Sequence, residues 1–178
     1  MISKEDGNVY FTEKSMGDIG MGRPNLGPDV PVWIYRLMQY TLKDYLDQEF
    51  GVQKADDILY NAGKIAGAGF CASRIGRDKE FNDFISTLQK ELRDNRIGVF
   101  RVEKQNTEKM HFIVTIAEDI DCSGIPITNE TLCVYDEGFL AGVMGFYTGK
   151  DFEAKEIDCW ATGERICRFE VKASDESD

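Results

Sequence analysis

The sequence predicts an α+β fold, because helical patterns fill its first half and strand patterns dominate its second. Apolar residues recur at helical spacing between residues 32 and 94, and segments rich in β-branched and aromatic residues begin near residue 98. The length of 178 residues, with 42% hydrophobic and 30% charged residues, is typical of one globular domain. We therefore expect an N-terminal arm (residues 1–31), one domain (residues 32–172) and an acidic, disordered tail (residues 173–178).

The arm contains three prolines and four glycines after residue 16, a composition that interrupts regular structure. A short strand at Val9 to Thr12 is predicted within it. The first helix spans Val32 to Phe50, and Gly51 marks its end. The apolar stripe of this amphipathic helix comprises Ile34, Leu37, Met38, Thr41, Leu42, Tyr45 and Leu46.

Two further helices are predicted at about residues 53–73 and 79–94. The first of them is rich in small residues, which let another backbone approach closely. Tight helix packing explains these residues, and a ligand lying against the same face would explain them too. The second carries a buried stripe formed by Phe81, Phe84, Ile85, Leu88 and Leu92.

The remaining elements are a hairpin, a helix and a second hairpin. Residues 98–103 and 110–118 are predicted strands joined by a polar turn at 105–109, and the second strand is apolar on both sides, so both of its faces should be covered. A helix follows at residues 130–148, capped by Thr128 or Asn129 and ended by Gly149. Strands at 152–160 and 166–172 complete the domain.

The charge and the apolar segments narrow the classes of partner. A formal net charge of −11 repels phosphate backbones and anionic lipids, so we expect no direct nucleic-acid partner. The longest apolar run, residues 139–147, is too short to cross a bilayer, and the N-terminus has no signal-peptide pattern. We expect a cytoplasmic protein that is not bound to membranes.

The five cysteines point to reduced thiols or a metal site, because an odd number in a chain without an export signal does not favour a disulfide framework. Cys159 and Cys167 lie symmetrically about Gly163, which would make them neighbours across a hairpin. Cys133 lies near the start of a predicted helix, where the helix dipole favours a thiolate. Glu156 precedes Cys159 by three residues, so both can face one ion only if the strand contains a bulge or bend.

The segment from Cys133 to Val171 resembles the 4-vinyl reductase domain family, which includes the sensor domains of phenol-responsive regulators. The matching residues are Cys133, the run Gly138-Phe139-Leu140-Ala141-Gly142, Glu156-x-x-Cys159, Gly163 and Cys167-Arg168-Phe169. The resemblance implies a structural zinc ion held by Cys133, Glu156, Cys159 and Cys167 near the C-terminus. Cys122 is the credible substitute for Glu156, and Cys71 is expected in the core.

The resemblance also implies that the helices pack on a small antiparallel sheet and enclose an apolar cavity, and that the protein is a homodimer. We expect a binding or sensor domain for a small hydrophobic molecule, aromatic or hydrocarbon, that acts through a partner protein. The alternative is an accessory or carrier protein of tetrapyrrole or vinyl-reductase metabolism. No motif proposes catalysis. Candidate ligand-binding residues, each also an ordinary core or strand residue type, are His111, Phe112, Tyr135, Phe139, Met144 and Trp160.

Overall fold

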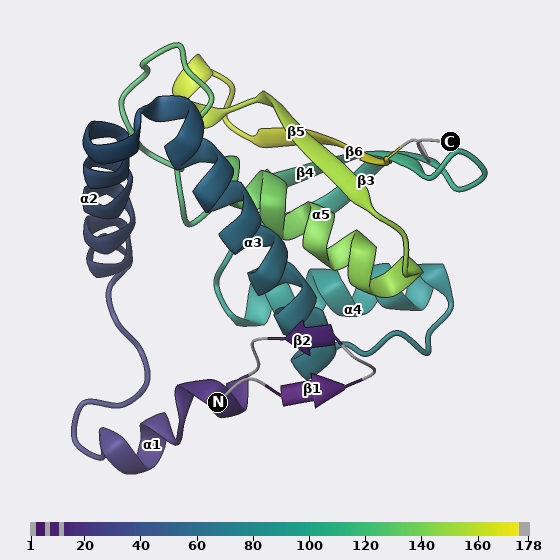
Figure 1. Ribbon diagram of the computed structural model, residues 1–178, viewed down its shortest axis with the longest axis horizontal. Helices are drawn as coiled ribbons and strands as arrows, with labels where there is room; N and C mark the ends of the chain where they lie inside the picture. Colours follow the sequence, from purple (N-terminus) through teal and green to yellow (C-terminus); the bar gives the residue numbers. More distant parts are fainter. Residues whose placement is uncertain (1–2, 6–7, 11–12, 175–178) are drawn as a thin grey trace.

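A computed structural model describes residues 3–5, 8–10 and 13–174, and it confirms the predicted α+β class (Figure 1). The domain has four long helices and a four-stranded antiparallel sheet. The helices are α2 (Val32–Phe50), α3 (Val52–Arg74), α4 (Phe81–Asp94) and α5 (Val134–Thr148). The strands are β3 (Val99–Asn106), β4 (His111–Ala117), β5 (Phe152–Asp158) and β6 (Cys167–Ala173).

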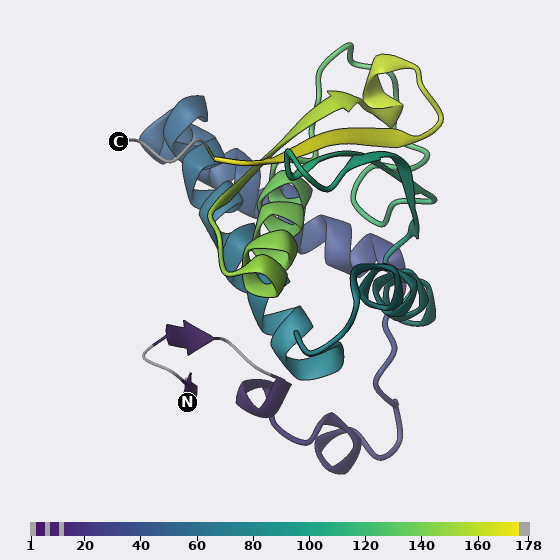
Figure 2. The ribbon, with the colours of Figure 1, turned by 90° about the vertical axis from the view of Figure 1, so that its right-hand side faces the viewer.

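The sheet and the helices form two layers (Figure 2). The strand order is β3-β4-β6-β5, so each of the two predicted hairpins contributes one central and one edge strand. Phe84, Leu88 and Leu92 of α4 are fully buried in the core, together with the inward residues of the sheet. Alternation along β5 and β6 places apolar side chains inward and charged ones outward, as a sheet with one covered face requires.

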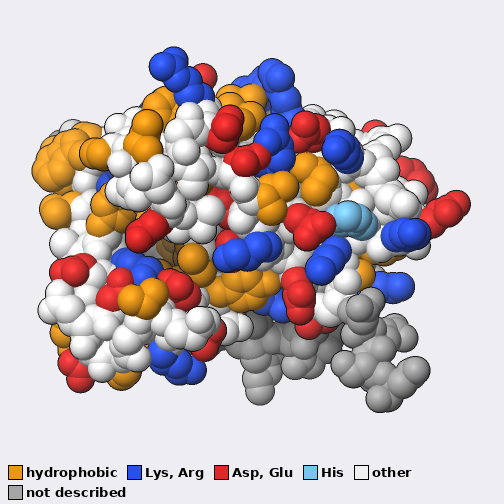
Figure 3. Space-filling model, turned by 90° about the horizontal axis from the view of Figure 1, so that it is seen from above, with side chains coloured by type: hydrophobic (Ala, Val, Ile, Leu, Met, Phe, Trp, Pro, Cys, Tyr) orange, Lys and Arg blue, Asp and Glu red, His pale blue; other side chains and the backbone are white. Residues whose placement is uncertain are grey.

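The prediction that both faces of β4 are covered is only partly met. Phe112, Val114 and Ile116 are buried against the helices, whereas Ile113 on the opposite face is half-buried. Seen from above, the molecule shows acidic and basic side chains interspersed with apolar ones (Figure 3). The outer face of the sheet is therefore a mixed surface and not a second core.

Glycines let α3 and α5 pack backbone to backbone. A Cβ at Gly67 would lie 2.0 Å from the Phe139 carbonyl oxygen, and one at Gly138 would lie 1.9 Å from that of Tyr60. Gly63 and Gly142 make equally close approaches on the same two helices. Of the two explanations for the small residues of α3, helix packing is the one that the structure supports.

The start of α5 differs from the prediction. The helix begins at Val134 with Cys133 in the cap position, and neither Thr128 nor Asn129 caps it. The backbone N–H groups of Thr128 and Asn129 both donate to the carbonyl oxygen of Ala161, at 2.9 Å. This segment is extended because it bonds to the β5–β6 connection, a long-range contact that local capping preferences do not reveal.

The polar side of α2 faces the body of the molecule. Tyr35 and Gln39 donate to the two carboxylate oxygens of Asp121, at 2.8 and 2.7 Å, and the Arg36 guanidinium donates to the carbonyl oxygen of Ile120 at 2.7 Å. The apolar stripe faces outward: of its members only Leu46 is buried, and Met38 is 63% exposed. The helix is thus present as predicted, but its apolar face packs on no other described element.

The N-terminal segment contains a small hairpin, β1 (Ser3–Glu5) and β2 (Asn8–Tyr10), a 3-10 turn, η1 (Glu13–Met16), and a single helical turn, α1 (Ile19–Gly22). The predicted strand at Val9 to Thr12 coincides with β2 in part, and residues 11–12 lie outside the described residues. β6 extends to Ala173, and residues 175–178 of the predicted tail also lie outside them. Within the described chain, every helix is too short or too polar to cross a bilayer.

Candidate metal centre

Four cysteines from separate segments meet at one end of the sheet. Cys122 lies in the loop after β4, Cys133 caps α5, Cys159 precedes the turn η2 (Trp160–Thr162), and Cys167 begins β6. All four are buried, and their sulfur atoms lie within 4.8 Å of one another. Cys71, in contrast, is buried in α3 as the predicted core cysteine, where burial raises its pKa to about 12.

The sulfur separations match those of a tetrahedral metal site. The Cys133 sulfur lies 3.9 Å from that of Cys159 and 3.8 Å from that of Cys167, and the Cys122 and Cys167 sulfurs are 3.0 Å apart. Zinc–sulfur bonds of about 2.3 Å in a regular tetrahedron place neighbouring sulfurs about 3.8 Å apart. A disulfide requires about 2.05 Å, and all four cysteines are free. The four thiols can therefore hold one metal ion.

The C-terminal hairpin has the predicted symmetry. Asp158 pairs with Arg168, so the next residues inward, Cys159 and Cys167, face each other, and Gly163 makes the turn with a φ of 101°. The register shifts by one residue between Glu156 and Asp158, with Ile157 exposed at the shift. This is the predicted bulge, and because of it Glu156 and Cys159 are both buried on the side of the metal centre.

Glu156 lies beside the four sulfurs but is not a member of the cluster. Its Oε2 accepts hydrogen bonds from the backbone N–H groups of Leu132 and Cys133, at 3.1 and 3.0 Å. The carboxylate therefore caps the start of α5, where exposed N–H groups favour negative charge. Its Oε1 is buried and has no hydrogen-bond partner among the described residues. Burial raises the pKa of Glu156 to about 8.

Without an ion, the protons distribute unevenly over the four sulfurs. Hydrogen bonds from Cys122, Cys133 and Cys167 lower the pKa of the Cys159 thiol, whereas contact with Cys122 raises the pKa of the Cys133 and Cys167 thiols. The metal-free cluster thus favours one thiolate surrounded by thiol donors. A bound cation would displace the remaining protons, because metal ligands must be deprotonated.

Three carboxylates adjoin the cluster, and sequence reasoning missed them. Asp119, Asp121 and Asp136 are all buried, and oxygen atoms of Asp119 and Asp136 lie within 4.8 Å of each other and of the Cys133 sulfur. Burial and the neighbouring charge of Asp121 raise the pKa of Asp119 to about 7. The signal in the sequence was the run Asp119-Ile120-Asp121-Cys122, in which acidic residues directly precede a cysteine.

The predicted ligand-binding residues do not form one site. Phe112 and Met144 line a closed apolar space between α4, α5 and the sheet, while Phe139 packs against Phe70 with ring centroids 5.6 Å apart. The Trp160 indole donates to the Ile125 carbonyl oxygen at 3.1 Å, and His111 contacts Glu170 at 2.9 Å. Tyr135 lies in a separate groove.

The closed space between α4 and the sheet has room for only about 10 Å³, about one water molecule or less. It is surrounded entirely by apolar side chains. They are Phe81, Ile85, Leu88, Phe100, Val102, Phe112, Val114, Leu140, Val143, Met144 and Val171. The structure thus contains a wholly apolar layer at the place where a cavity was expected, and an enclosed cavity is not shown.

An open groove of about 980 Å³ lies between α2, α3 and the segment 129–135. Met38, Leu42 and Leu59 contribute apolar surface to it, and Lys43 and Asp56 form an ion pair in it at 3.2 Å. Tyr135 is the one predicted ligand residue that lines it.

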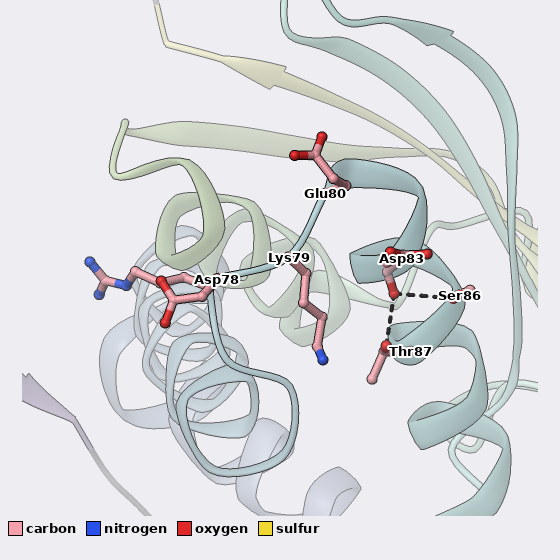
Figure 4. Close-up of a pocket in the computed structure, with 7 residues that line it drawn as sticks. Asp78, Lys79, Glu80, Asp83, Ser86 and Thr87 are labelled. Carbon is pink, nitrogen blue, oxygen red and sulfur yellow. Dashed lines mark hydrogen bonds between the residues drawn. The ribbon is translucent and has the colours of Figure 1, made fainter.

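A second hollow lies where α3 connects to α4 (Figure 4). Its lining mixes Asp78, Lys79, Glu80 and Asp83, and the labelled side chains point in different directions (Figure 4). Ser86 and Thr87 donate to the backbone carbonyl oxygen of Asp83, as ordinary helix-surface hydroxyls do. We assign no site to this hollow.

Comparisons with known proteins place the chain. Residues 112–173 match the model of the 4-vinyl reductase domain. Two uncharacterised proteins of Methanocaldococcus jannaschii are similar in sequence: MJ0150 is 30% identical over 66% of this chain and 65% of its own length, and MJ1642 is 27% identical over 84% of this chain and 82% of its own. The match thus spans slightly less than two thirds of MJ0150 and most of MJ1642.

Solved structures with the same fold include three from different settings. The phenol-bound sensory domain of the transcription activator PoxR has a TM-score of 0.61 at 12% identity, covering 81% of this chain and 75% of that one. A vinyl-4-reductase family protein of Methanocaldococcus jannaschii has a TM-score of 0.59 at 19% identity, covering 93% and 98%. Subunit 3 of a trafficking protein particle complex from Naegleria fowleri, covalently bound to palmitic acid, has a TM-score of 0.62 at 12% identity, covering 81% and 95%.

The match to the family model begins in β4 and ends with β6, so it contains all four clustered cysteines and Glu156. Residues 112–173 are therefore a 4-vinyl reductase domain, which confirms the family resemblance predicted from the segment between Cys133 and Val171.

Proposed function

We propose that this chain is a zinc-containing binding or sensor domain for a small hydrophobic molecule, aromatic or hydrocarbon, and that it acts through a partner protein. The observation that carries the proposal is the wholly apolar layer between α4 and the sheet, within a 4-vinyl reductase domain. The fold shared with the phenol-bound sensory domain of PoxR supports the same class of ligand.

The lining of that layer favours an apolar ligand over a phenol. None of the eleven lining side chains carries a nitrogen or oxygen atom. A phenolic hydroxyl in this space would lose its hydrogen bonds to water without a replacement, which costs about 1–3 kcal/mol. A hydrocarbon such as toluene has no such cost. The site therefore selects for compounds without polar groups.

Ligand binding would have to move α4, because the space is closed in this structure. Phe81 stacks on Phe112 with ring centroids 5.3 Å apart, and Phe84 stacks on Tyr147 of α5 at 4.1 Å. A benzene-sized ligand cannot enter without separating α4 from the sheet. Displacement of α4 is then the change that a partner protein would recognise.

Thermal unfolding with toluene and with phenol tests the proposal. Toluene should raise the melting temperature by mass action, by an amount equivalent to about 2.7 kcal/mol when its concentration is 100 times the dissociation constant. Leu88→Ala enlarges the apolar space and should increase this stabilisation, whereas Leu46→Ala removes the same atoms from α2, away from the lining. Equal or greater stabilisation by phenol would contradict the ligand class. No toluene effect even in Leu88→Ala would contradict the site.

The zinc ion in this proposal is structural. The sulfur separations and the burial of the four cysteines support it, and Glu156 is the alternative fourth ligand because its Oε1 is buried without a partner among the described residues. Zinc with four protein ligands has no open position for substrate, so it would fasten the loop after β4, α5 and the C-terminal hairpin to one another. Five free cysteines support a reducing, cytoplasmic location.

A homodimer is the second element of the proposal. The apolar face of α2 is exposed along most of its length, with Trp33 and Met38 each 63% exposed and Leu37 56%. Exposed apolar patches of this extent mark interaction sites, and a two-fold dimer covers the same patch on both copies.

The runner-up function is a carrier of tetrapyrroles or similar macrocycles. The groove of about 980 Å³ beside α2 is the observation that favours it, because that volume is at the upper end for ligand pockets. A carrier should retain a coloured macrocycle through purification, detectable as visible absorbance. A colourless protein that binds toluene favours the sensor over the carrier.

A further inference from the structure

We infer that a second divalent cation binds beside the cysteine cluster, held by Asp119, Asp136 and the Cys133 thiolate. This goes beyond the proposed function, which requires one structural ion. Oxygen atoms of the two carboxylates and the Cys133 sulfur lie within 4.8 Å of one another, and all three residues are buried. The three come from the loop after β4 and the start of α5.

Asp136 carries the inference, because one of its carboxylate oxygens is buried without a hydrogen-bond donor. The residue is 8% exposed, and its Oδ2 has no hydrogen-bond partner in the part of the chain that the structure describes. Asp119 and Asp121 differ from it: Asp119 accepts from the backbone N–H of Asp121 at 2.7 Å, and Asp121 accepts from Tyr35 and Gln39. A buried carboxylate lacking such partners costs several kcal/mol unless it gains a proton or a cation.

The surroundings provide negative charge without a matching base. Among the described residues, no salt bridge reaches Asp119, Asp121 or Asp136. The Arg36 guanidinium, the base of α2 that contacts this loop, donates to carbonyl oxygens of the loop and not to the carboxylates. One divalent ion among four thiolates leaves that centre with an excess of negative charge, so it cannot offset the adjacent carboxylates.

The donor set indicates the class of cation. Two carboxylate oxygens and one thiolate sulfur form a mixed hard and soft set, which suits zinc and similar divalent transition metals better than magnesium or calcium. Cys133 belongs to both groups of donors, so its thiolate would bridge the two ions. Three protein ligands leave one tetrahedral position open, unlike the closed shell of the first ion.

Native mass spectrometry of the full chain, loaded with excess Zn²⁺ and desalted, tests the inference. We expect two zinc ions per chain in the wild-type protein and one in Asp136→Asn. Asp151→Asn is the matched control and should keep two, because Asp151 is exposed and paired with Lys64 at 2.7 Å.

The outcomes separate this inference from the proposed function. One zinc ion per chain in the wild-type protein overturns the second site and leaves the first, and it would mean that the carboxylates share protons instead. No zinc overturns both. Two ions that persist in Asp136→Asn overturn the assignment of ligands. The wild-type count also tests the inference if Asp136→Asn does not fold.

Discussion

The fourth ligand of the metal centre is decided by single residues. Cys122 places its sulfur in the cluster, whereas Glu156 uses one oxygen to cap α5 and keeps the other unpaired among the described residues. We predict that Cys122→Ser abolishes tight zinc binding and that Glu156→Gln weakens it less, since a glutamine oxygen can still cap the helix. Zinc affinity measured by competition with a chelator decides the order. The reverse order of effects would make Glu156 the ligand and Cys122 a neighbour.

The contact between α3 and α5 depends on single glycines. We predict that Gly138→Ala destabilises the protein by about 2–4 kcal/mol, because the new methyl group would overlap the Tyr60 carbonyl oxygen and force two backbones apart. Gly145→Ala on the same helix is the control, since its methyl group would come no closer than 3.3 Å to the Lys150 carbonyl oxygen. Urea unfolding of both variants measures the difference. Equal stabilities would mean that α3 and α5 adjust freely.

Residue types identified the cysteine cluster, but they could not identify the acidic residues beside it. The symmetric spacing of Cys159 and Cys167 about Gly163 predicted their pairing, because a hairpin imposes that geometry locally. Asp119 and Asp136 meet only after the loop and α5 have packed together, and a lone acidic residue is normally exposed. Their burial is therefore a tertiary property that spacing along the chain does not encode.

At the scale of elements, periodicity predicted the type of each long helix and strand, but not which way α2 faces. An apolar stripe ordinarily faces the core, and the stripe of α2 faces outward because its polar side binds Asp121 and the neighbouring carbonyl groups. The same periodicity would describe either orientation. The orientation depends on partners more than 80 residues away in the chain.

The outward face of α2 gives a prediction about assembly. The double variant Leu37→Ser, Met38→Ser should convert a dimer into monomers without lowering the stability of the monomer, because both side chains are more than half exposed in the single chain. Sedimentation equilibrium measures the mass. Ile65→Ser is the control, since that residue is also 56% exposed but lies on α3. A wild-type protein that is monomeric at all concentrations would contradict the dimer.

At the scale of the whole molecule, the metal centre connects segments that the core does not hold together by itself. The loop of residues 118–133 contains no helix or strand, and it is attached through Cys122, Cys133 and the contacts of α2 with Asp121. In contrast, α3, α5 and the sheet are joined by a continuous apolar core. Removal of the ion should therefore affect one end of the molecule more than the other.

We predict that chelation of zinc lowers the hydrogen-exchange protection of residues 118–133 and of the turn around Gly163, while α3 and the centre of β4 keep theirs. The physical reason is that zinc binding supplies folding free energy only to the segments that it joins, and local opening follows local stability. Hydrogen exchange followed by mass spectrometry, before and after chelation, resolves these segments. Cys71→Ser is the control: it should lower global stability through the core without changing the response to the chelator, because Cys71 is outside the cluster. A uniform loss of protection would mean that the ion holds the entire domain, and no change would mean that the thiols alone hold this end of the molecule together.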